Sequence, residues 1–292
     1  MEIGLIFALL AAVGLALGTV FVRKGSFRVG ESFTSVAISI FIGVTFFLLV
    51  MLFTADWDKL RSVSGQGLAL LATAGVIHFV VGRFLGYTCF RLIGANRGIT
   101  ILRTQILYAV FFGILLLNEP LTVFLILGVL SLAAGATLVS VEKGTETTKL
   151  HGKGVLAGLG GGFFWGISGV LIKPGIAEIG SPYAAAFISY TAASLVIAGL
   201  LLRKGQREQL LHLPRQSISP LVISGLFVAI AQLLRYLALS YSPVSVVTPL
   251  IGINVLFTFF LSFLLNRDIE VFTWKVFIGI AVTAVGAFLL FQ

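Results

Sequence analysis

Residues 98–141 read GITILRTQILYAVFFGILLLNEPLTVFLILGVLSLAAGATLVSV, two apolar runs separated by the short polar break Asn118-Glu119-Pro120. Each run is about 20 residues long, the length that an α-helix needs to cross the hydrocarbon core of a bilayer. Because lipid offers no hydrogen-bond partner to an exposed peptide group, such runs must be helical. The stretch predicts two transmembrane helices joined by a tight turn, in which we expect Glu119-Pro120 to cap and begin the second helix.

The rest of the chain follows the same pattern of long apolar runs and short connections, none of which could hold a soluble domain. Ten such runs are expected to span the membrane, at residues 3–22, 33–54, 68–90, 98–117, 121–141, 154–172, 183–202, 219–240, 243–265 and 270–291. The predicted fold class is therefore an all-α integral membrane protein with ten transmembrane helices.

The composition agrees with a membrane protein. Of the 292 residues, 58% are hydrophobic and 11% are charged, and the mean hydropathy is +1.10. These values argue against a disordered chain or a soluble domain, and the single cysteine, Cys89, excludes a disulfide scaffold. The net charge is +9. Most of the basic residues lie between apolar runs, where they indicate the orientation in the membrane rather than nucleic-acid binding. The expected partners are membrane lipid and a small-molecule substrate, with no nucleic acid.

The basic residues in the connections predict the orientation. If the N-terminus lies outside, the inner connections hold thirteen basic residues and the outer connections hold three. The inner set is Arg23, Lys24, Arg28, Arg91, Arg97, Lys143, Lys149, Lys153, Arg203, Lys204, Arg207, Arg215 and Arg267, and the outer set is Lys59, Arg61 and Lys173. Since inner loops carry the excess of Lys and Arg, we expect both termini outside, in a prokaryotic plasma membrane.

The two halves of the chain resemble each other at an offset of about 150 residues. Residues 18–25 align with 168–175, and Gly128 and Gly135 align with Gly279 and Gly286. The predicted repeats are residues 1–147 and 148–292, with five spans each. An odd number of spans makes the second copy enter the membrane from the opposite side, so the repeats are inverted, as in many secondary transporters.

The chain resembles the drug/metabolite transporter superfamily, in its EamA-type branch. The most family-like stretch is 87–141, with Arg91-Leu92-Ile93-Gly94-Ala95-Asn96 followed by the Asn118–Thr122 turn, and a second copy starts at Tyr236. The resemblance implies the ten-helix fold. It also implies transport of a small molecule, since the superfamily includes metabolite and amino-acid exporters, sugar-phosphate exchangers and small multidrug pumps.

Charged residues inside the spans are candidate functional residues, because charge is costly in a bilayer. No carboxylate lies in the middle of a span, which disfavours the multidrug pumps that bind cations through a buried glutamate. The charges expected to be buried are instead Arg83, Arg103 and Arg235. Guanidinium groups suit carboxylates and phosphates, so these arginines predict a cavity for an anionic or zwitterionic solute. The alternative is that they extend to the interface or bond backbone carbonyls.

Several polar residues share helix faces with these arginines at spacings of three or four. The predicted substrate-binding residues are Arg83, Tyr87, Thr100, Arg103, Trp165, Gln232, Arg235, Tyr236 and Asn254. Gln105, Tyr108 and Tyr190 are weaker candidates, and ordinary helix packing explains the aromatic ones equally well.

His78 is the one histidine near the middle of a span, and it could relay protons. It lies nine residues from Tyr87, about 180° around a regular helix, which favours a packing histidine bonded to a neighbouring helix. Pro249, inside the ninth span, should kink or loosen that helix. Gly158, Gly162 and Gly166 recur every four residues, a spacing that lets helices approach closely.

The function predicted is a secondary active or exchange transporter that moves a small anionic or zwitterionic organic metabolite by alternating access. Alternatives are a flippase for an anionic lipid head group, a membrane enzyme, or a non-transporting subunit. The sequence shows neither a nucleotide-binding motif nor a membrane cluster of catalytic residue types. We therefore expect no enzymatic activity, no catalytic residues, no cofactor and no metal site.

Overall fold

The computed structural model describes residues 2–26, 32–93, 101–140, 152–211, 213–265 and 274–290, and within these ranges every regular element is a helix. In chain order the elements are α1 (Glu2–Ser26), α2 (Ser32–Thr54), α3 (Trp57–Ser62), α4 (Gly65–Gly75), the π-helical η1 (Val76–Gly82), α5 (Arg83–Ile93), α7 (Gln105–Leu117), α8 (Val123–Ser140), α9 (Gly152–Ile179), α10 (Pro182–Leu201), α11 (Lys204–Leu211), α12 (Arg215–Tyr241), α13 (Val244–Ile251), α14 (Asn254–Leu265) and α15 (Trp274–Leu289).

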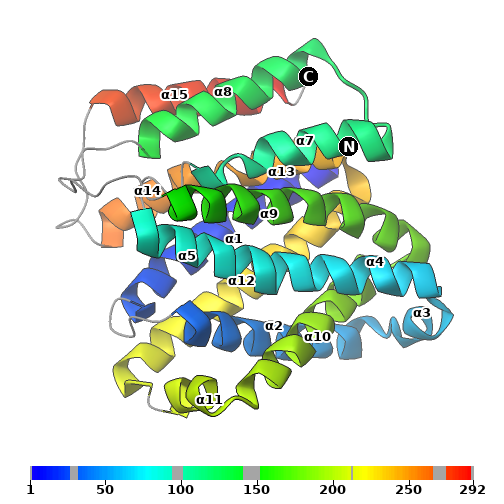
Figure 1. Ribbon diagram of the computed structural model, residues 1–292. Coiled ribbons are helices and arrows are strands. Elements are labelled where there is room, and N and C mark those ends of the chain that lie inside the picture. The colour runs from blue at the N-terminus through cyan, green and yellow to red at the C-terminus, as the bar shows by residue number, and fades with distance from the viewer. Residues whose placement is uncertain are drawn as a thin grey trace.

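These elements confirm the ten predicted spans. Six of the described helices are long and apolar enough to cross a membrane, and shorter apolar helices accompany them. The third span is the continuous rod α4–η1–α5, and the ninth is the pair α13 and α14. Figure 1 shows the long helices lying across the view, with both chain termini at one end of the bundle and α11 at the opposite end. We name these the termini end and the far end.

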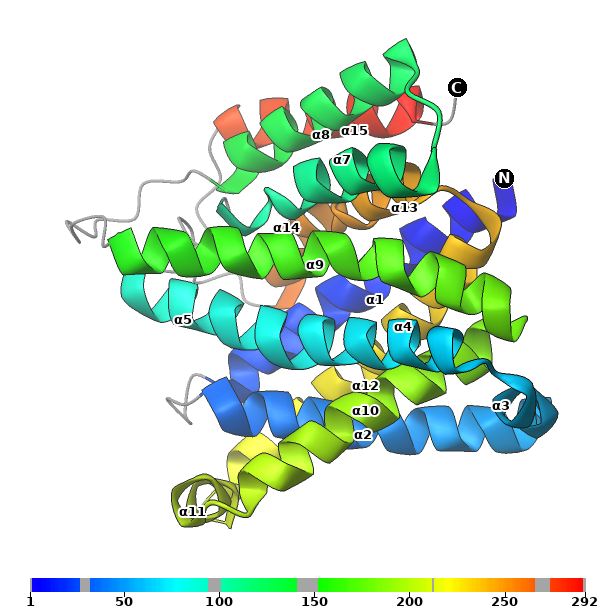
Figure 2. The same cartoon turned by 45° about the vertical axis from the view of Figure 1, so that its right-hand side comes forward.

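The pairing of α8 with α15 shows the inverted relation between the two halves. A Cβ on Gly128 would lie 3.1 Å from the carbonyl oxygen of Gly286, and one on Gly135 would lie 2.6 Å from that of Gly279. The matched glycines therefore contact each other crosswise, Gly128 with the counterpart of Gly135 and Gly135 with the counterpart of Gly128. A twofold axis requires this exchange of partners. The two helices lie side by side in both ribbon views (Figures 1 and 2).

Other helix pairs follow the same twofold pattern. α1 packs on α12, and its counterpart α9 packs on α4 and α5. The predicted glycine stripe of α9 forms the α7 contact: a Cβ on Gly162 would lie 2.6 Å from Thr104 Oγ1, and one on Gly166 would lie 2.7 Å from the Gln105 carbonyl. Small residues thus bring the helices together, as lipid-embedded bundles require. The predicted boundary between repeats, at residues 147 and 148, lies outside the described residues.

Two details of the helix ends differ from the sequence expectation. The fifth span begins at Val123 and is capped by Thr122, whose Oγ1 accepts from the Leu125 N–H at 3.1 Å; Glu119 does not cap it. The sixth span extends past residue 172 to Ile179, so Lys173 lies within α9 rather than in a connection. Charged residues near the polar ends of helices leave such boundaries poorly marked in sequence.

The predicted effect of Pro249 is confirmed. Pro249 lies in α13, which ends at Ile251, and α14 starts at Asn254 after a turn at Gly252 and Ile253. Interrupted helices leave backbone carbonyls without helical partners, and in transporters they commonly surround the binding site.

Candidate functional site

A central cavity of about 290 Å³ lies between the two halves of the bundle. This volume is close to the lower limit for small-molecule sites. Both repeats contribute to its lining, which consists of Leu15, Gly18, Thr19, Val22, Ser35, Ser39, His78, Arg83, Gly86, Leu102, Arg103, Gln105, Trp165, Leu221, Ser224, Val228, Gln232, Arg235, Thr248, Ile251 and Asn254. All three arginines predicted from the sequence are among these residues.

Arg103 connects the fourth span to the interrupted ninth span. It lies in the turn just before α7, and its guanidinium donates to the Gly252 carbonyl at 2.6 Å and to Asn254 Oδ1 at 3.2 Å. Both acceptors lie at the break between α13 and α14. Arg103 is 9% exposed, and its acceptors are neutral, so its positive charge is held in place without being neutralised.

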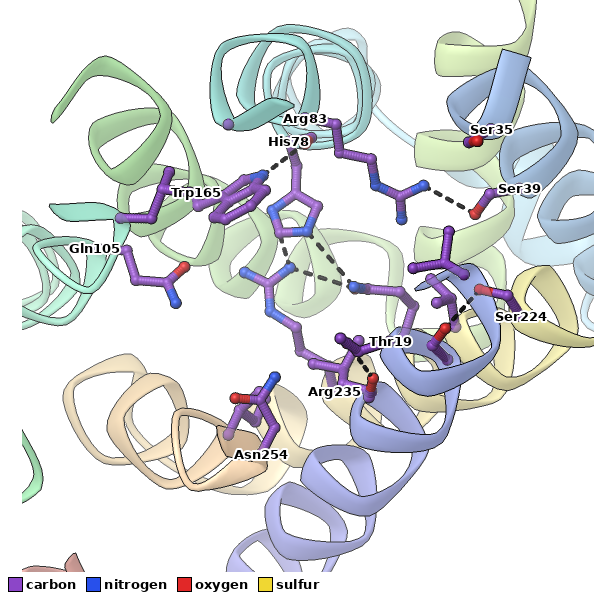
Figure 3. Close-up of a pocket in the computed structure, with 18 of the residues that line it drawn as sticks. Thr19, Ser35, Ser39, His78, Arg83, Gln105, Trp165, Ser224, Arg235 and Asn254 are labelled. Carbon is purple, nitrogen blue, oxygen red and sulfur yellow. Dashed lines mark hydrogen bonds between the residues drawn. The ribbon is translucent and has the colours of Figure 1, made fainter. Parts of the chain in front are cut away.

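Arg235 lies in a polar cluster beside His78. Its guanidinium donates to Ser168 Oγ at 3.1 Å and lies 3.5 Å from Gln232 Oε1. The side chain is 5% exposed. A Cβ on Gly169 would lie 3.4 Å from an Arg235 nitrogen, so the glycine of α9 leaves room for the guanidinium. Figure 3 shows Arg235 and His78 converging in the cavity.

Ser168 and Arg235 both contact one nitrogen of His78. Ser168 Oγ donates to the Trp165 carbonyl at 2.7 Å and accepts from Arg235. His78 Nδ1 lies 2.8 Å from the same oxygen and 3.4 Å from the Arg235 guanidinium, and Gln232 Nε2 lies 3.5 Å from His78 Nε2. The imidazole is thus held between α9 and α12, directly beside the guanidinium of Arg235.

The π-helical segment η1 explains why His78 and Arg83 both reach the cavity. Five residues on a regular α-helix turn by about 140°, which would separate the two side chains. A π-helix bonds residue i to residue i+5 and brings these positions into line, and such segments are frequent at functional sites. The expectation that His78 bonds a neighbouring helix is confirmed through Ser168 of α9. The regular-helix geometry behind it does not hold in η1.

Arg83 reaches the side of the cavity formed by α2. Its guanidinium donates to Ser39 Oγ at 2.9 Å and lies over the Phe79 ring, 5.3 Å from the ring centroid. Figure 3 shows it extended toward Ser39 and away from Arg235. Arg83 is only partly buried, unlike Arg103 and Arg235.

Most other predicted site residues also line the cavity. Trp165, Gln232 and Asn254 do so, and the Trp165 Nε1 donates to the His78 carbonyl at 3.1 Å. Tyr236 does not: it is fully buried in the core, one turn beyond Gln232 toward the termini end. Thr100 lies outside the described residues, and the Tyr87 side chain is likewise not described.

Of the weaker candidates, Gln105 lines the cavity, whereas Tyr108 and Tyr190 are not among its lining residues. The ring of Tyr108 packs against Phe163, and that of Tyr190 packs against Phe79 and Phe47.

The hydroxyl residues of the cavity were not predicted from the sequence; they are Thr19, Ser35, Ser39, Ser224 and Thr248. Thr19 and Ser224 bond backbone carbonyls, of Leu15 and Gly18 respectively. A serine or threonine hydroxyl can bond the backbone carbonyl four residues earlier in its own helix, as Thr19 does. Its presence in a span therefore carries little signal.

The cavity occupies the middle of the bundle and the half toward the far end. Its lining residues on α1, Leu15 to Val22, belong to the second half of that helix, and Ser35 and Ser39 belong to the start of α2. Both helix segments lie toward the far end (Figures 1 and 2).

Glu119 connects the halves at the termini end. Its carboxylate accepts from the N–H groups of Val244, at 2.6 Å, and Ser245, at 2.8 Å, the first residues of α13. It also pairs with Lys173 Nζ at 3.4 Å, and Lys173 donates to the Ser242 carbonyl at 2.9 Å. A carboxylate at a helix N-terminus is favourable, but the helix is α13 of the second repeat rather than the fifth span. We call these residues, Glu119, Lys173, Ser242, Val244 and Ser245, the termini-end latch.

Among the described residues, no group of three or more His, Cys, Asp or Glu side chains is placed to hold a metal ion. The described lining of the cavity also contains no acidic residue. The site therefore presents guanidinium, amide, hydroxyl, imidazole and indole groups. These can bind anionic and hydrogen-bonding parts of a small molecule.

The sequence profile of the EamA-like transporter family matches residues 2–141 and residues 152–292. A protein from Sinorhizobium sp. described as "Uncharacterized transporter in cobO 3'region" is 29% identical over 136 residues, which are 46% of this chain and 94% of that protein. A protein of known crystal structure shares the fold, with a TM-score of 0.78 and 15% identity over 98% of this chain and 94% of its own. The chain belongs to the EamA-like transporter family, of the drug/metabolite transporter type, and is a membrane transporter.

Proposed function

We propose that this protein is a secondary active or exchange transporter for a small anionic or zwitterionic organic metabolite, such as an amino acid or a related solute. The solute binds in the central cavity and crosses by alternating access. The observation that carries the proposal is the convergence of Arg83, Arg103 and Arg235 on one cavity with neutral partners. Buried charge without a counter-charge is costly, and a bound anion removes much of that cost.

Alternating access is supported by the uneven distribution of contacts between the two ends. The termini-end latch joins the turn after α7 to α9 and α13, and Ser181 donates to the Asp56 carboxylate at the same end. The cavity lies in the half toward the far end. In this conformation the termini end is closed and the cavity lies toward the far end. If the two inverted repeats exchange conformations, the far end closes and the cavity opens toward the termini end.

The proposed orientation puts both termini outside a prokaryotic plasma membrane. Lys204 and Arg207 in α11, with Arg203 just before it, belong to the far end. Lys59 and Arg61 in α3 belong to the termini end (Figure 1). The excess of basic residues at the far end supports a cytoplasmic far end. In this orientation the cavity faces the cytoplasm.

A flippase for an anionic lipid head group is the second candidate, and one observation favours it. An apolar cavity of about 380 Å³ lies between α2, η1, α5 and α10, lined by residues that include Phe33, Phe84, Leu200 and Arg203. Such a surface suits an acyl chain, and the guanidinium of Arg203 suits a phosphate. Accelerated flipping of fluorescent phosphatidylglycerol in proteoliposomes, lost in Arg203→Gln, would favour this function over metabolite transport.

The main test is counterflow in proteoliposomes loaded with candidate metabolites. The wild type should accumulate labelled solute against a loaded pool, whereas Arg103→Gln and Arg235→Gln should reduce the rate by at least ten-fold. Arg207→Gln removes an exposed arginine of α11 and should leave the rate unchanged. Normal counterflow by well-folded Arg103→Gln and Arg235→Gln proteins would refute the anion site.

A further inference from the structure

The charge balance of the cavity narrows the class of solute. Arg83, Arg103 and Arg235 place three positive charges in its wall. Their acceptors are a serine hydroxyl for Arg83, a carbonyl and an amide oxygen for Arg103, and a hydroxyl and an amide oxygen for Arg235. None of these acceptors carries a negative charge.

Carboxylates of the described residues near the bundle interior are engaged elsewhere. Glu119 is held in the termini-end latch, and Asp56 accepts from Ser181 at the same end. No acidic side chain belongs to the described lining of the cavity. A solute with no net charge would leave all three arginines uncompensated. A dianion leaves one net positive charge, which favours it over a monoanion in a medium of low dielectric constant.

The two most buried arginines come from different repeats. Arg103 lies in the turn before α7 and is 9% exposed, and Arg235 lies in α12 and is 5% exposed. Arg103 donates two hydrogen bonds to described residues, and a guanidinium carries five N–H groups. N–H groups of Arg103 therefore remain for a solute, and those groups can meet an anion bidentately.

We propose that the transported solute is a small organic dianion whose anionic oxygens are bound by both Arg103 and Arg235. The inference rests on the proposed transport function and narrows its substrate class. A zwitterion fits less well because its ammonium group would find only neutral acceptors beside three guanidinium groups. A dianion that spans Arg103 and Arg235 also joins the two repeats, so its binding favours arrangements in which both arginines approach the solute.

The experiment compares ligands that differ by one charge. Succinate carries two carboxylates, and monomethyl succinate has nearly the same length and one carboxylate. Glycerol 3-phosphate supplies a phosphate dianion, and alanine supplies a zwitterion. Binding to the purified protein is measured as the rise in its thermal unfolding midpoint at constant ionic strength, since a ligand of the folded state raises apparent stability. Counterflow of the same four solutes is measured in proteoliposomes.

Succinate, glycerol 3-phosphate or both should bind at least ten-fold more tightly than monomethyl succinate and alanine. Arg103→Gln and Arg235→Gln should each reduce the preference for succinate over its monomethyl ester to about two-fold or less. Arg207→Gln should keep the full preference. Arg103→Lys keeps the charge and should retain part of the preference, so it serves if Arg103→Gln does not fold.

The outcomes separate this inference from the transport proposal. Counterflow of alanine or monomethyl succinate at least as efficient as that of the dianions would overturn the dianion and leave transport standing. Tight succinate binding without counterflow of any solute would support the dianion site and overturn transport. Absence of stabilisation by both dianions at millimolar concentration would overturn the dianion site.

Discussion

Arg103 bonds Gly252 and Asn254, which lie 149 and 151 residues later in the chain. These are the two offsets at which the repeats match before and after Arg103, so Arg103 contacts the region of the second repeat that corresponds to its own position. A residue contacts its own counterpart only where it lies close to the twofold axis, so the cavity lies on that axis. Gly86 and Arg235, and likewise Arg83 and Gln232, are related by the same offset as Tyr87 and Tyr236, and all four line the cavity. The cavity is thus lined by equivalent backbone positions from both repeats, but in each pair only one of the two residues is charged.

His78 is the residue whose replacement tests proton coupling. A second proton on its imidazole would place another positive charge beside Arg235, whose guanidinium lies 3.4 Å from His78 Nδ1, with Arg83 also lining the cavity. A bound anion offsets this repulsion, so solute and proton should enter together. We expect His78→Gln to bind solute with nearly wild-type affinity but to show uptake that no longer responds to an imposed pH gradient. A gradient response equal to that of the wild type would contradict this coupling.

At the residue scale, the sequence identifies the side chains whose burial in lipid costs much free energy, and it does not identify those whose burial costs little. A guanidinium in a span is conspicuous because lipid excludes it, and all three of these arginines reach the cavity. Ser39 and Ser224 are equally part of the wall, and in the structure both bond residues of other helices. In the sequence they are inconspicuous, because a hydroxyl in a span can also bond the backbone of its own helix. The spacing of four residues places Tyr236 on the same helix face as Gln232. Tyr236 nevertheless lies one turn beyond the cavity, where its side chain is buried in the core.

At the element scale, the glycines of α9 test how closely the helices must approach. In Gly166→Ala, the added Cβ would lie 2.7 Å from the Gln105 carbonyl oxygen and 2.8 Å from the Tyr108 Cβ. Because part of the obstruction is backbone, we expect a loss of about 1–3 kcal/mol in stability, seen as a lower thermal unfolding midpoint in detergent. Gly199→Ala is the control, since a Cβ there meets nothing within 4 Å. Equal midpoints for the two variants would refute the tight contact.

Glu119 tests the termini-end latch. In Glu119→Gln, the charge-assisted bonds to the Val244 and Ser245 N–H groups become weaker, and the pair with Lys173 is lost. Since hydrogen bonds to charged groups contribute about 1.5–3 kcal/mol, amide exchange at the start of α13 should accelerate by on the order of ten-fold, as measured by hydrogen–deuterium exchange mass spectrometry. Asp58→Asn alters an exposed carboxylate of α3 and should leave this exchange unchanged. An unaltered rate in Glu119→Gln would show that the latch does not hold α13.

Elements were predictable where hydrophobic length alone decides them. The run 98–141 predicts two helical spans because no other structure satisfies the hydrogen bonds of so long an apolar segment in lipid. Pro249 predicts a break in the ninth span because it removes a helical hydrogen bond. The π-helical segment η1 has no such marker in Val76–Gly82, because packing against α9 and α10 decides it. For the same reason Glu119 was assigned to the nearest helix in sequence, although it caps one that is near only in space.

At the scale of the whole molecule, the repeat was readable from sequence because matched glycines lie at the α8–α15 contact, where twofold geometry fixes their spacing. Hydrophobic runs determine the number of spans, but they do not determine which helices pack together, because lipid and protein surfaces are both apolar. The pairing of α1 with α12 therefore required the structure. So did the location of the cavity toward the far end.

The most direct test of the account is the accessibility of one cavity residue from both sides of the membrane. Thr19 lines the cavity, and Thr19→Cys, in a Cys89→Ser background, can be alkylated by a membrane-impermeant maleimide in right-side-out and inside-out vesicles. Alternating access predicts labelling from the far end in the arrangement described here, and labelling from the termini end when Glu119→Gln is added. Labelling from a single side under every condition, with Glu119→Gln included, would contradict an alternately exposed cavity between two inverted repeats.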